Sequence, residues 1–236
     1  MKTLVARDDR GIGDRFATAM ALAPFHRRIP HITYLTLDRD LDRVWPMLKP
    51  FCSEIRDSEI RHDLAPTWSW NADNLVFQPR QSFYFTRINT IAELTNTRPG
   101  AIRRNPFNFP PHNSSMAGKK YVVLHPYAST PDKSMPEYDI AVIKHYCAGK
   151  NIPVITLPLA DIPLSRALGF VTDAALVIAV DSCISHFAYW LRPELPTIVC
   201  YYNTSKDFIF PGLPEPLPTL YSGTELARIK QQIDKL

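Results

Sequence analysis

Glycine is scarce in this sequence, with 8 glycines against 22 prolines among 236 residues. The few glycines form neither a Walker-type phosphate loop nor a Gly-x-Ser-x-Gly nucleophile elbow. These absences exclude the glycine-built sites of P-loop enzymes and of α/β-hydrolases. The many prolines instead predict a chain rich in loops.

Cysteine is also rare, and its positions share no metal-binding spacing. The four cysteines stand at 52, 147, 183 and 200, without a Cys-x-x-Cys pair, and each lies among apolar residues. We therefore expect free, buried thiols rather than a zinc site or a set of disulfides. The sequence implies no metal.

Long hydrophobic runs are missing as well. No apolar stretch reaches the length of a transmembrane helix or of a signal-peptide core, so we expect a soluble, cytoplasmic protein without an integral membrane segment. Hydrophobic residues still make up 45% of the chain, which is enough to bury the core of one or two domains. Two small lobes are the favoured organisation.

The charge of the chain is moderately positive, with a net charge of +4 and an isoelectric point near 8.9. A basic balance favours polyanionic partners such as nucleotides, nucleic acid or an anionic membrane surface. A solvated surface of dispersed lysines and arginines explains the same balance equally well.

Apolar and amphipathic segments alternate along the chain, which predicts an α/β fold with parallel sheets and right-handed crossovers. In the first half we expect elements at 3–6, 14–22, 31–37, 41–51, 52–55 and 83–95, with loop and short irregular strands between 61 and 80. In the second half we expect them at 121–125, 137–150, 153–157, 164–170, 174–180, 185–191, 197–201 and 224–235. The turn-rich segment 98–120 predicts a linker, and the two lobes are placed at 1–115 and 116–236.

The most informative segment is Asp181-Ser-Cys-Ile-Ser-His186, which follows the apolar run 174–180. An apolar run that ends at an acid is typical of a buried parallel strand, whose carboxyl end carries ligand-binding side chains in open α/β sheets. If Ser182 caps the next helix, Ser185 and His186 lie in its first turn, beside backbone N–H groups suited to a phosphate. The segment therefore predicts a nucleoside-diphosphate pocket.

This segment resembles a signature of the heptosyltransferase family of glycosyltransferases, in which a strand precedes Asp-(Ser/Thr)-Gly-x-x-His. Asp181, Ser182 and His186 match the signature, and Cys183 replaces the glycine.

Two further segments resemble the same family, in the expected order. Upstream, the hydroxyl residues Ser129 and Thr130 and then Lys133-Ser-Met-Pro136 stand where the family has small hydroxyl residues and Lys-x-Trp-Pro. Near the N-terminus, Gly13-Asp14 is similar to the Gly-Asp that begins the family's first helix. Three matches together are far more specific than any one of them.

The resemblance implies two Rossmann-like lobes with parallel sheets facing a central cleft, the first lobe on the acceptor side and the second binding a nucleotide sugar. It implies a metal-independent, inverting glycosyltransferase that takes the nucleotide sugar as substrate and needs no cofactor. The chain resembles a shortened member whose loss falls in the acceptor half, so the acceptor is not carried over.

Transfer from a nucleotide sugar requires stabilisation of the leaving diphosphate. Lys133 is the expected cation for the phosphates, Ser129 and Thr130 the hydroxyl donors, and His186 a further donor. Asp181 would repel a diphosphate, so we expect it to orient the helix N-terminus or to bind a sugar hydroxyl.

Transfer also requires a base for the acceptor hydroxyl, and Asp14 is the candidate. Its alternative role is simple helix N-capping, since aspartate is a preferred cap. The alternatives elsewhere are a surface lysine at 133, an ordinary turn at 129–130 and a satisfied buried histidine at 186. The Asp38-Arg39-Asp40 sequence matches a metal–sugar motif of another architecture, but an exposed charged turn explains it more simply.

The sequence leaves the acceptor open between two polyanionic classes. DNA carrying hydroxymethylated bases is one, with flipped bases stacking on aromatic residues such as Trp68 and Trp70. A lipid-linked or lipopolysaccharide glycan, met at the inner membrane surface, is the other. The alternative to an enzyme is a non-catalytic sugar-nucleotide sensor or assembly protein.

Overall fold

The computed structural model describes most of the chain. The residues outside this description are 1, 10, 37–48, 59–65, 76–81, 102–115, 117, 158–163, 193, 203–217 and 223–224. The Asp38–Asp40 motif and most of the helix expected at 41–51 lie among them. The chain folds into two compact units: unit 1 holds the described residues up to Ala101, and unit 2 holds those from Met116 onward.

Unit 1 contains a sheet of four parallel strands in the order β3-β2-β1-β4. Its strands are β1 (Thr3–Arg7), β2 (His31–Thr36), β3 (Glu54–Asp57) and β4 (Trp68–Asn71). β1 lies in the interior of the sheet, and its central residues Leu4, Val5 and Ala6 are buried. A short apolar strand with neighbours on both sides is typical of a parallel α/β sheet.

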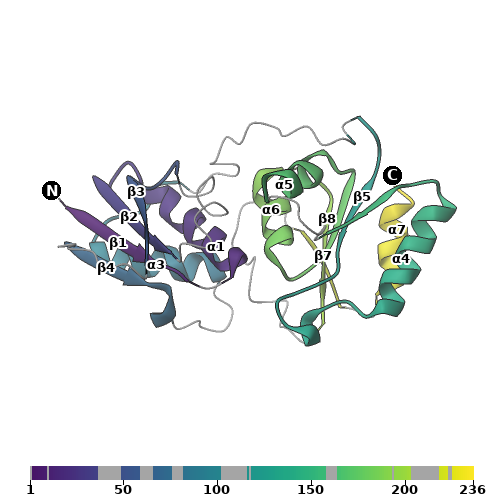
Figure 1. Cartoon of the computed structure of the whole chain (residues 1–236), viewed down its shortest axis with the longest axis horizontal. Coiled ribbons are helices and arrows are strands. Elements are labelled where there is room, and N and C mark those ends of the chain that lie inside the picture. The colour runs from purple at the N-terminus through teal and green to yellow at the C-terminus, as the bar shows by residue number, and fades with distance from the viewer. Residues whose placement is uncertain are drawn as a thin grey trace. The chain divides into compact units, whose positions relative to one another are not determined.

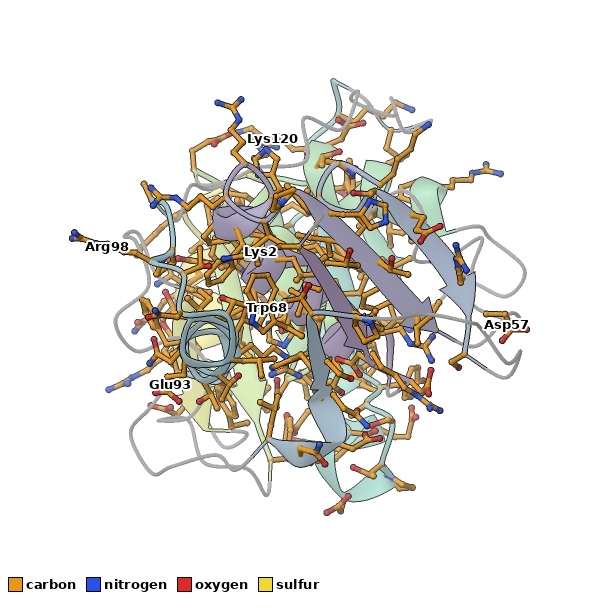
Figure 2. The ribbon with its side chains drawn as sticks, turned by 90° about the vertical axis from the view of Figure 1, so that its left-hand side faces the viewer. Lys2, Asp57, Trp68, Glu93, Arg98 and Lys120 are labelled. Atoms are coloured by element: carbon orange, nitrogen blue, oxygen red, sulfur yellow. The ribbon has the colours of Figure 1, made fainter. Side chains whose placement is uncertain are left out.

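The strand β4 corrects one expectation. The sequence between 61 and 80 predicted loop and short irregular strands. β4 is short, but it is regular, because it pairs with β1 in parallel register, with Leu4 opposite Trp68 and Ala6 opposite Trp70. The indole of Trp70 is buried, and its N–H donates to Thr90 Oγ1 at 3.0 Å. Trp68 is half-buried, and the Lys2 ammonium lies 5.5 Å from its ring centroid (Figure 2).

Two α-helices cover the described part of unit 1, and they pack against each other. They are α1 (Ile12–Leu22), which continues into the 3₁₀ turn η1 (Ala23–Phe25), and α3 (Phe83–Thr95). A further 3₁₀ turn, η3 (Ala72–Asn74), follows β4. The helix α3 has the predicted bounds and ends at Asn96, which adopts a left-handed conformation with φ 47°.

Unit 2 contains a second parallel sheet, of five strands in the order β6-β5-β7-β8-β9. Its strands are β5 (Val122–His125), β6 (Val154–Thr156), β7 (Leu176–Val180), β8 (Thr197–Tyr201) and β9 (Thr219–Ser222). Every residue of β5, β7 and β8 is buried, as expected for inner strands covered on both faces. The sequence did not predict β9.

Helices cover both faces of this sheet (Figure 1). They are α4 (Glu137–Gly149), α5 (Leu164–Asp173), α6 (Cys183–Leu191) and α7 (Leu226–Ile233), with the 3₁₀ turn η4 (Pro131–Lys133) before α4. In Figure 1, α5 and α6 lie on one side of the strands, and α4 and α7 lie on the other. Apolar residues of α4 and α7 form one core with alternate residues of the inner strands.

The alternation of strand and helix confirms the predicted α/β class with two Rossmann-like parallel sheets. Among the described helices, none is long and apolar enough to cross a bilayer. The described residues also contain no cluster of three or more His, Cys, Asp or Glu side chains placed to hold a metal ion.

Candidate functional site

Three adjacent strands of unit 2 end at one edge of its sheet. β7 lies between β5 and β8, and the parallel register aligns the carboxyl ends of all three. His125 is the last residue of β5, Tyr201 is the last of β8, and Asp181 directly follows β7. This edge is where open α/β sheets bind ligands, and it carries the predicted Asp181 segment.

Ser182 joins this edge to helix α6. It is the N-cap residue of α6, as predicted, and its Oγ lies 2.9 Å from His125 Nδ1. The Ser182 N–H donates to Ser185 Oγ at 3.4 Å, and the Ser185 hydroxyl donates to the Ser182 carbonyl at 2.7 Å. Hydrogen bonds therefore hold the first turn of α6 both within the helix and to the end of β5.

His125 is a neutral group at this edge. Its side chain is buried, and burial lowers its pKa to about 4, because a charged imidazolium loses its hydration there. At neutral pH one ring nitrogen donates and the other accepts. The His125–Ser182 hydrogen bond therefore joins two uncharged groups, and it fixes the Ser182 side chain without adding charge to the site.

This shift of the His125 pKa predicts a pH-dependent loss of stability. The pKa is about 4 in the folded chain and about 6.5 in the unfolded chain. Between these values the unfolded chain binds the proton more strongly, so the stabilisation is complete above pH 6.5 and is lost as the pH falls toward 4. Between pH 7 and pH 5 the loss is about 2 kcal/mol.

Urea unfolding of the wild type and of His125→Gln at pH 7 and pH 5 measures this loss. The variant should show a smaller decrease in the free energy of unfolding than the wild type. His145→Gln is the matched control, because His145 is exposed on α4, and it should behave as the wild type does. Equal pH dependence in all three proteins would show that His125 does not titrate as its burial requires.

Asp181 lies among two other polar side chains of the same edge. Its Oδ1 is 3.9 Å from Nε2 of the buried His186. Burial, and then the negative charge of Asp181, raise the pKa of Tyr201 well above its ordinary value. Among the described residues, the buried Tyr201 hydroxyl has no hydrogen-bond partner. The carboxylate thus lies near the His186 ring, and its charge helps to keep the Tyr201 hydroxyl protonated.

The loop after β5 leads away from the same edge and contains the other predicted donor-side residues. It is closed by the Met135 N–H, which donates to the Pro126 carbonyl at 2.7 Å. The Ser134 hydroxyl oxygen accepts from the Ala128 N–H at 3.0 Å, a contact that the sequence did not indicate. Ser129 and Thr130 are exposed on this loop. The Met135 side chain, in place of the family's tryptophan, is buried in the core of unit 2.

Lys133 lies at the end of η4, with a half-buried side chain. In the described part of the chain it forms no ion pair. A lysine that is partly removed from water and pairs with no carboxylate among the described residues is suited to bind an anion that is not part of the protein.

Cys183 occupies the position of the family's glycine, at the first residue of α6. Burial raises the pKa of its thiol to about 11. The thiol therefore stays protonated at neutral pH, which leaves it without nucleophilic character.

Asp14 belongs to unit 1 and lies in the first turn of α1. The alternative prediction, that Asp14 is the helix N-cap, is wrong, because Gly11 occupies that position and contributes no side-chain cap. The Asp14 carboxylate instead accepts a hydrogen bond from Arg87 on α3, with Nη2 2.9 Å from Oδ1. The Asp14 side chain keeps 30% of its surface exposed, whereas the Arg87 side chain has none.

The structure thus brings Asp181, Ser182 and His186 together at one sheet edge, and it places Ser129, Thr130 and Lys133 on the loop that starts there. It adds His125 and Tyr201, which the sequence had assigned only to strands, and Arg87, which it had assigned only to a helix. The position of His125 and Tyr201 at strand ends was the one available signal for them. Nothing in the sequence singled out Arg87.

The fold defines a class of proteins built from two Rossmann-like parallel sheets, and solved heptosyltransferases share it. No family model matches the chain, and no curated protein sequence matches it significantly. The structure is similar to E. coli heptosyltransferase WaaC with ADP (TM-score 0.67, 13% identity, 99% of each chain covered). It is also similar to E. coli ADP-heptose lps heptosyltransferase II (TM-score 0.65, 15% identity, 100% of this chain and 98% of that chain covered).

A third similar structure is a glycosyl transferase family 9 protein from Veillonella parvula DSM 2008 (TM-score 0.62, 12% identity, 100% of this chain and 90% of that chain covered). At these identities the likeness establishes the fold, which agrees with the family that the three sequence motifs resemble.

Proposed function

We propose that the chain is a glycosyltransferase that moves a sugar from a nucleoside-diphosphate sugar to an acceptor hydroxyl. The observation that carries this proposal is the edge of the unit 2 sheet, where Asp181, Ser182 and His186 gather at the start of α6. The fold shared with solved heptosyltransferases supports the same reaction class. The solved WaaC structure contains ADP, so an adenosine diphosphate sugar is the first donor to test.

On the donor side, the chain supplies a positive environment for the diphosphate. The N–H groups that open α6 and the positive end of its dipole favour an anion. Lys133 adds a full charge, Ser129 and Thr130 add hydroxyl donors, and His186 donates when Asp181 orients its ring. These groups stabilise the leaving diphosphate without a metal ion in the proposed mechanism.

On the acceptor side, Asp14 is the proposed base. The acceptor oxygen forms a bond to the anomeric carbon while the bond from that carbon to the diphosphate oxygen breaks, and the electron pair leaves with the diphosphate. The proton of the acceptor hydroxyl passes to the Asp14 carboxylate. A single displacement of this kind inverts the anomeric configuration.

A glycan is the favoured acceptor class. Hydroxymethylated DNA would need exposed aromatic residues for stacking. Of the two tryptophans that the sequence suggested for this role, Trp70 is buried and hydrogen-bonded to Thr90, and Trp68 is half-buried. The similar E. coli protein is an lps heptosyltransferase. We therefore propose a lipopolysaccharide or other cell-surface glycan as the acceptor, met in the cytoplasm or at the inner membrane surface.

A transfer assay tests the proposed function. The purified protein is incubated with ADP-heptose, or with UDP- and GDP-sugars, in the presence of EDTA, and nucleoside diphosphate release and product mass are followed. We expect release that increases on adding lipopolysaccharide and does not increase on adding hydroxymethylated DNA. Binding of a nucleotide sugar without release under any condition would contradict the enzyme and favour a sugar-nucleotide sensor.

A further inference from the structure

Arg87, on α3, is a fully buried cation of unit 1. The packing of α3 alone does not explain why a charged side chain is buried there. Its Nη2 lies 2.9 Å from Asp14 Oδ1 and 4.0 Å from Asp8 Oδ2. Its Nε donates to Thr18 Oγ1 at 3.3 Å, and the Thr18 hydroxyl donates to Asp8 Oδ2 at 2.6 Å. Arg87, Asp8 and Thr18 have no exposed surface.

Buried partners therefore hold the guanidinium on one side, and its Nη2 extends toward Asp14 on the other. Thr18 accepts from Nε, whereas Nη2 donates to Asp14 and lies 4.0 Å from Asp8. Asp14 is the only member of the four with exposed surface. The planar fork of arginine allows both contacts at once, which an ammonium group cannot reproduce. Because Asp14 is in the first turn of α1 and Arg87 is on α3, the contact also joins the two helices.

The charges of this group suit a carboxylate that gains and loses a proton. Arg87 faces two carboxylates, with Asp14 at 2.9 Å and Asp8 at 4.0 Å from its Nη2. When Asp14 takes up a proton, Arg87 remains balanced by Asp8, so no unpaired cation is left buried.

We propose that Arg87 is a positioning residue, which holds the Asp14 carboxylate in the orientation needed to receive the acceptor proton, with Asp8 as the counter-charge. The inference rests on the proposed role of Asp14 as the base. Arg87 acts through Asp14 and does not contact substrate itself.

The test compares ADP-heptose turnover, followed as ADP release with the acceptor found in the transfer assay, in four proteins: wild type, Arg87→Lys, Asp14→Asn and the double variant. Arg87→Lys keeps the charge but loses the fork, and we expect kcat to fall by about 10- to 100-fold, with the KM for ADP-heptose unchanged. In the Asp14→Asn background the same change should have no further effect, because residues that act as a unit are not additive.

Arg56→Lys is the matched control, because it also replaces a guanidinium of unit 1 that pairs with a carboxylate, but the partner of Arg56 is Glu54 on the same strand. We expect kcat of this variant to stay near the wild-type value. The inference is overturned if Arg87→Lys keeps the wild-type kcat, or if its effect multiplies with that of Asp14→Asn. Absence of turnover in the wild type would instead overturn the proposed function, and this inference with it.

Discussion

Replacing Asp14 by asparagine should reduce sugar transfer by about 100- to 10,000-fold, which is the range that a positioned general base contributes. The asparagine amide has nearly the same shape as the carboxylate, but it cannot take up the acceptor proton at neutral pH. Donor affinity should not change, because the proposed diphosphate-binding residues all belong to unit 2. The measurement is nucleoside diphosphate release at saturating donor, together with a calorimetric titration of ADP.

The control for this substitution is Asp73→Asn. Asp73 is an exposed carboxylate of unit 1, in the turn after β4, so the change removes the same charge from the same unit. It should leave transfer at the wild-type rate. If Asp14→Asn retained more than about one tenth of the wild-type rate, the loss would fall below what removal of a general base produces, and Asp14 would not be the base.

Replacing Lys133 by alanine should weaken donor binding by about 10- to 100-fold. A charge-assisted contact from an ammonium to a phosphate contributes roughly 1.5–3 kcal/mol. Lys133 is half-buried and forms no ion pair with the residues that the structure describes, so its removal breaks no salt bridge seen there. Calorimetric titration of ADP into wild type and variant measures the loss directly.

Lys144→Ala is the matched control for Lys133→Ala, because Lys144 is an exposed lysine on α4, and ADP should bind this variant as it binds the wild type. The salt dependence provides a second criterion. Screening weakens an ion–phosphate contact, so raising the salt concentration should reduce ADP affinity more in the wild type than in Lys133→Ala. Equal ADP affinities in wild type and Lys133→Ala would remove Lys133 from the donor site.

The alternation of strands and helices could be predicted because it is a local property. The apolar runs that became β5, β7 and β8 are continuous and buried, and such runs identify inner parallel strands without knowledge of their partners. The strand β9 was missed, and β4 was expected only as part of a region of loop and short irregular strands, because neither segment has a clear apolar run or period. Their pairing depends on distant partners, with β4 lying beside β1 some sixty residues away, and no local pattern encodes that.

The same distinction applies to the candidate site. Asp181, Ser182 and His186 lie close together in the sequence, so a strand end and a helix cap were enough to predict that they gather. His125 and Ser182, which form a hydrogen bond, are 57 positions apart in the sequence. Arg87 and Asp14 are 73 positions apart. Such contacts follow from the packing of neighbouring elements. The capping role considered for Asp14 failed for a local reason, since the helix begins earlier, at Ile12, with Gly11 as its N-cap.

The most direct test of the account is a titration of ADP into the wild-type protein in EDTA, followed by calorimetry and by NMR of the histidine side chains. The account predicts saturable binding of one ADP per chain, with the resonances of His125 and His186 shifted and the exposed His145 unchanged. Failure of ADP, and then of UDP and GDP, to bind or to shift these resonances would contradict it. The edge of the unit 2 sheet would then be a strand end and a helix cap without a ligand.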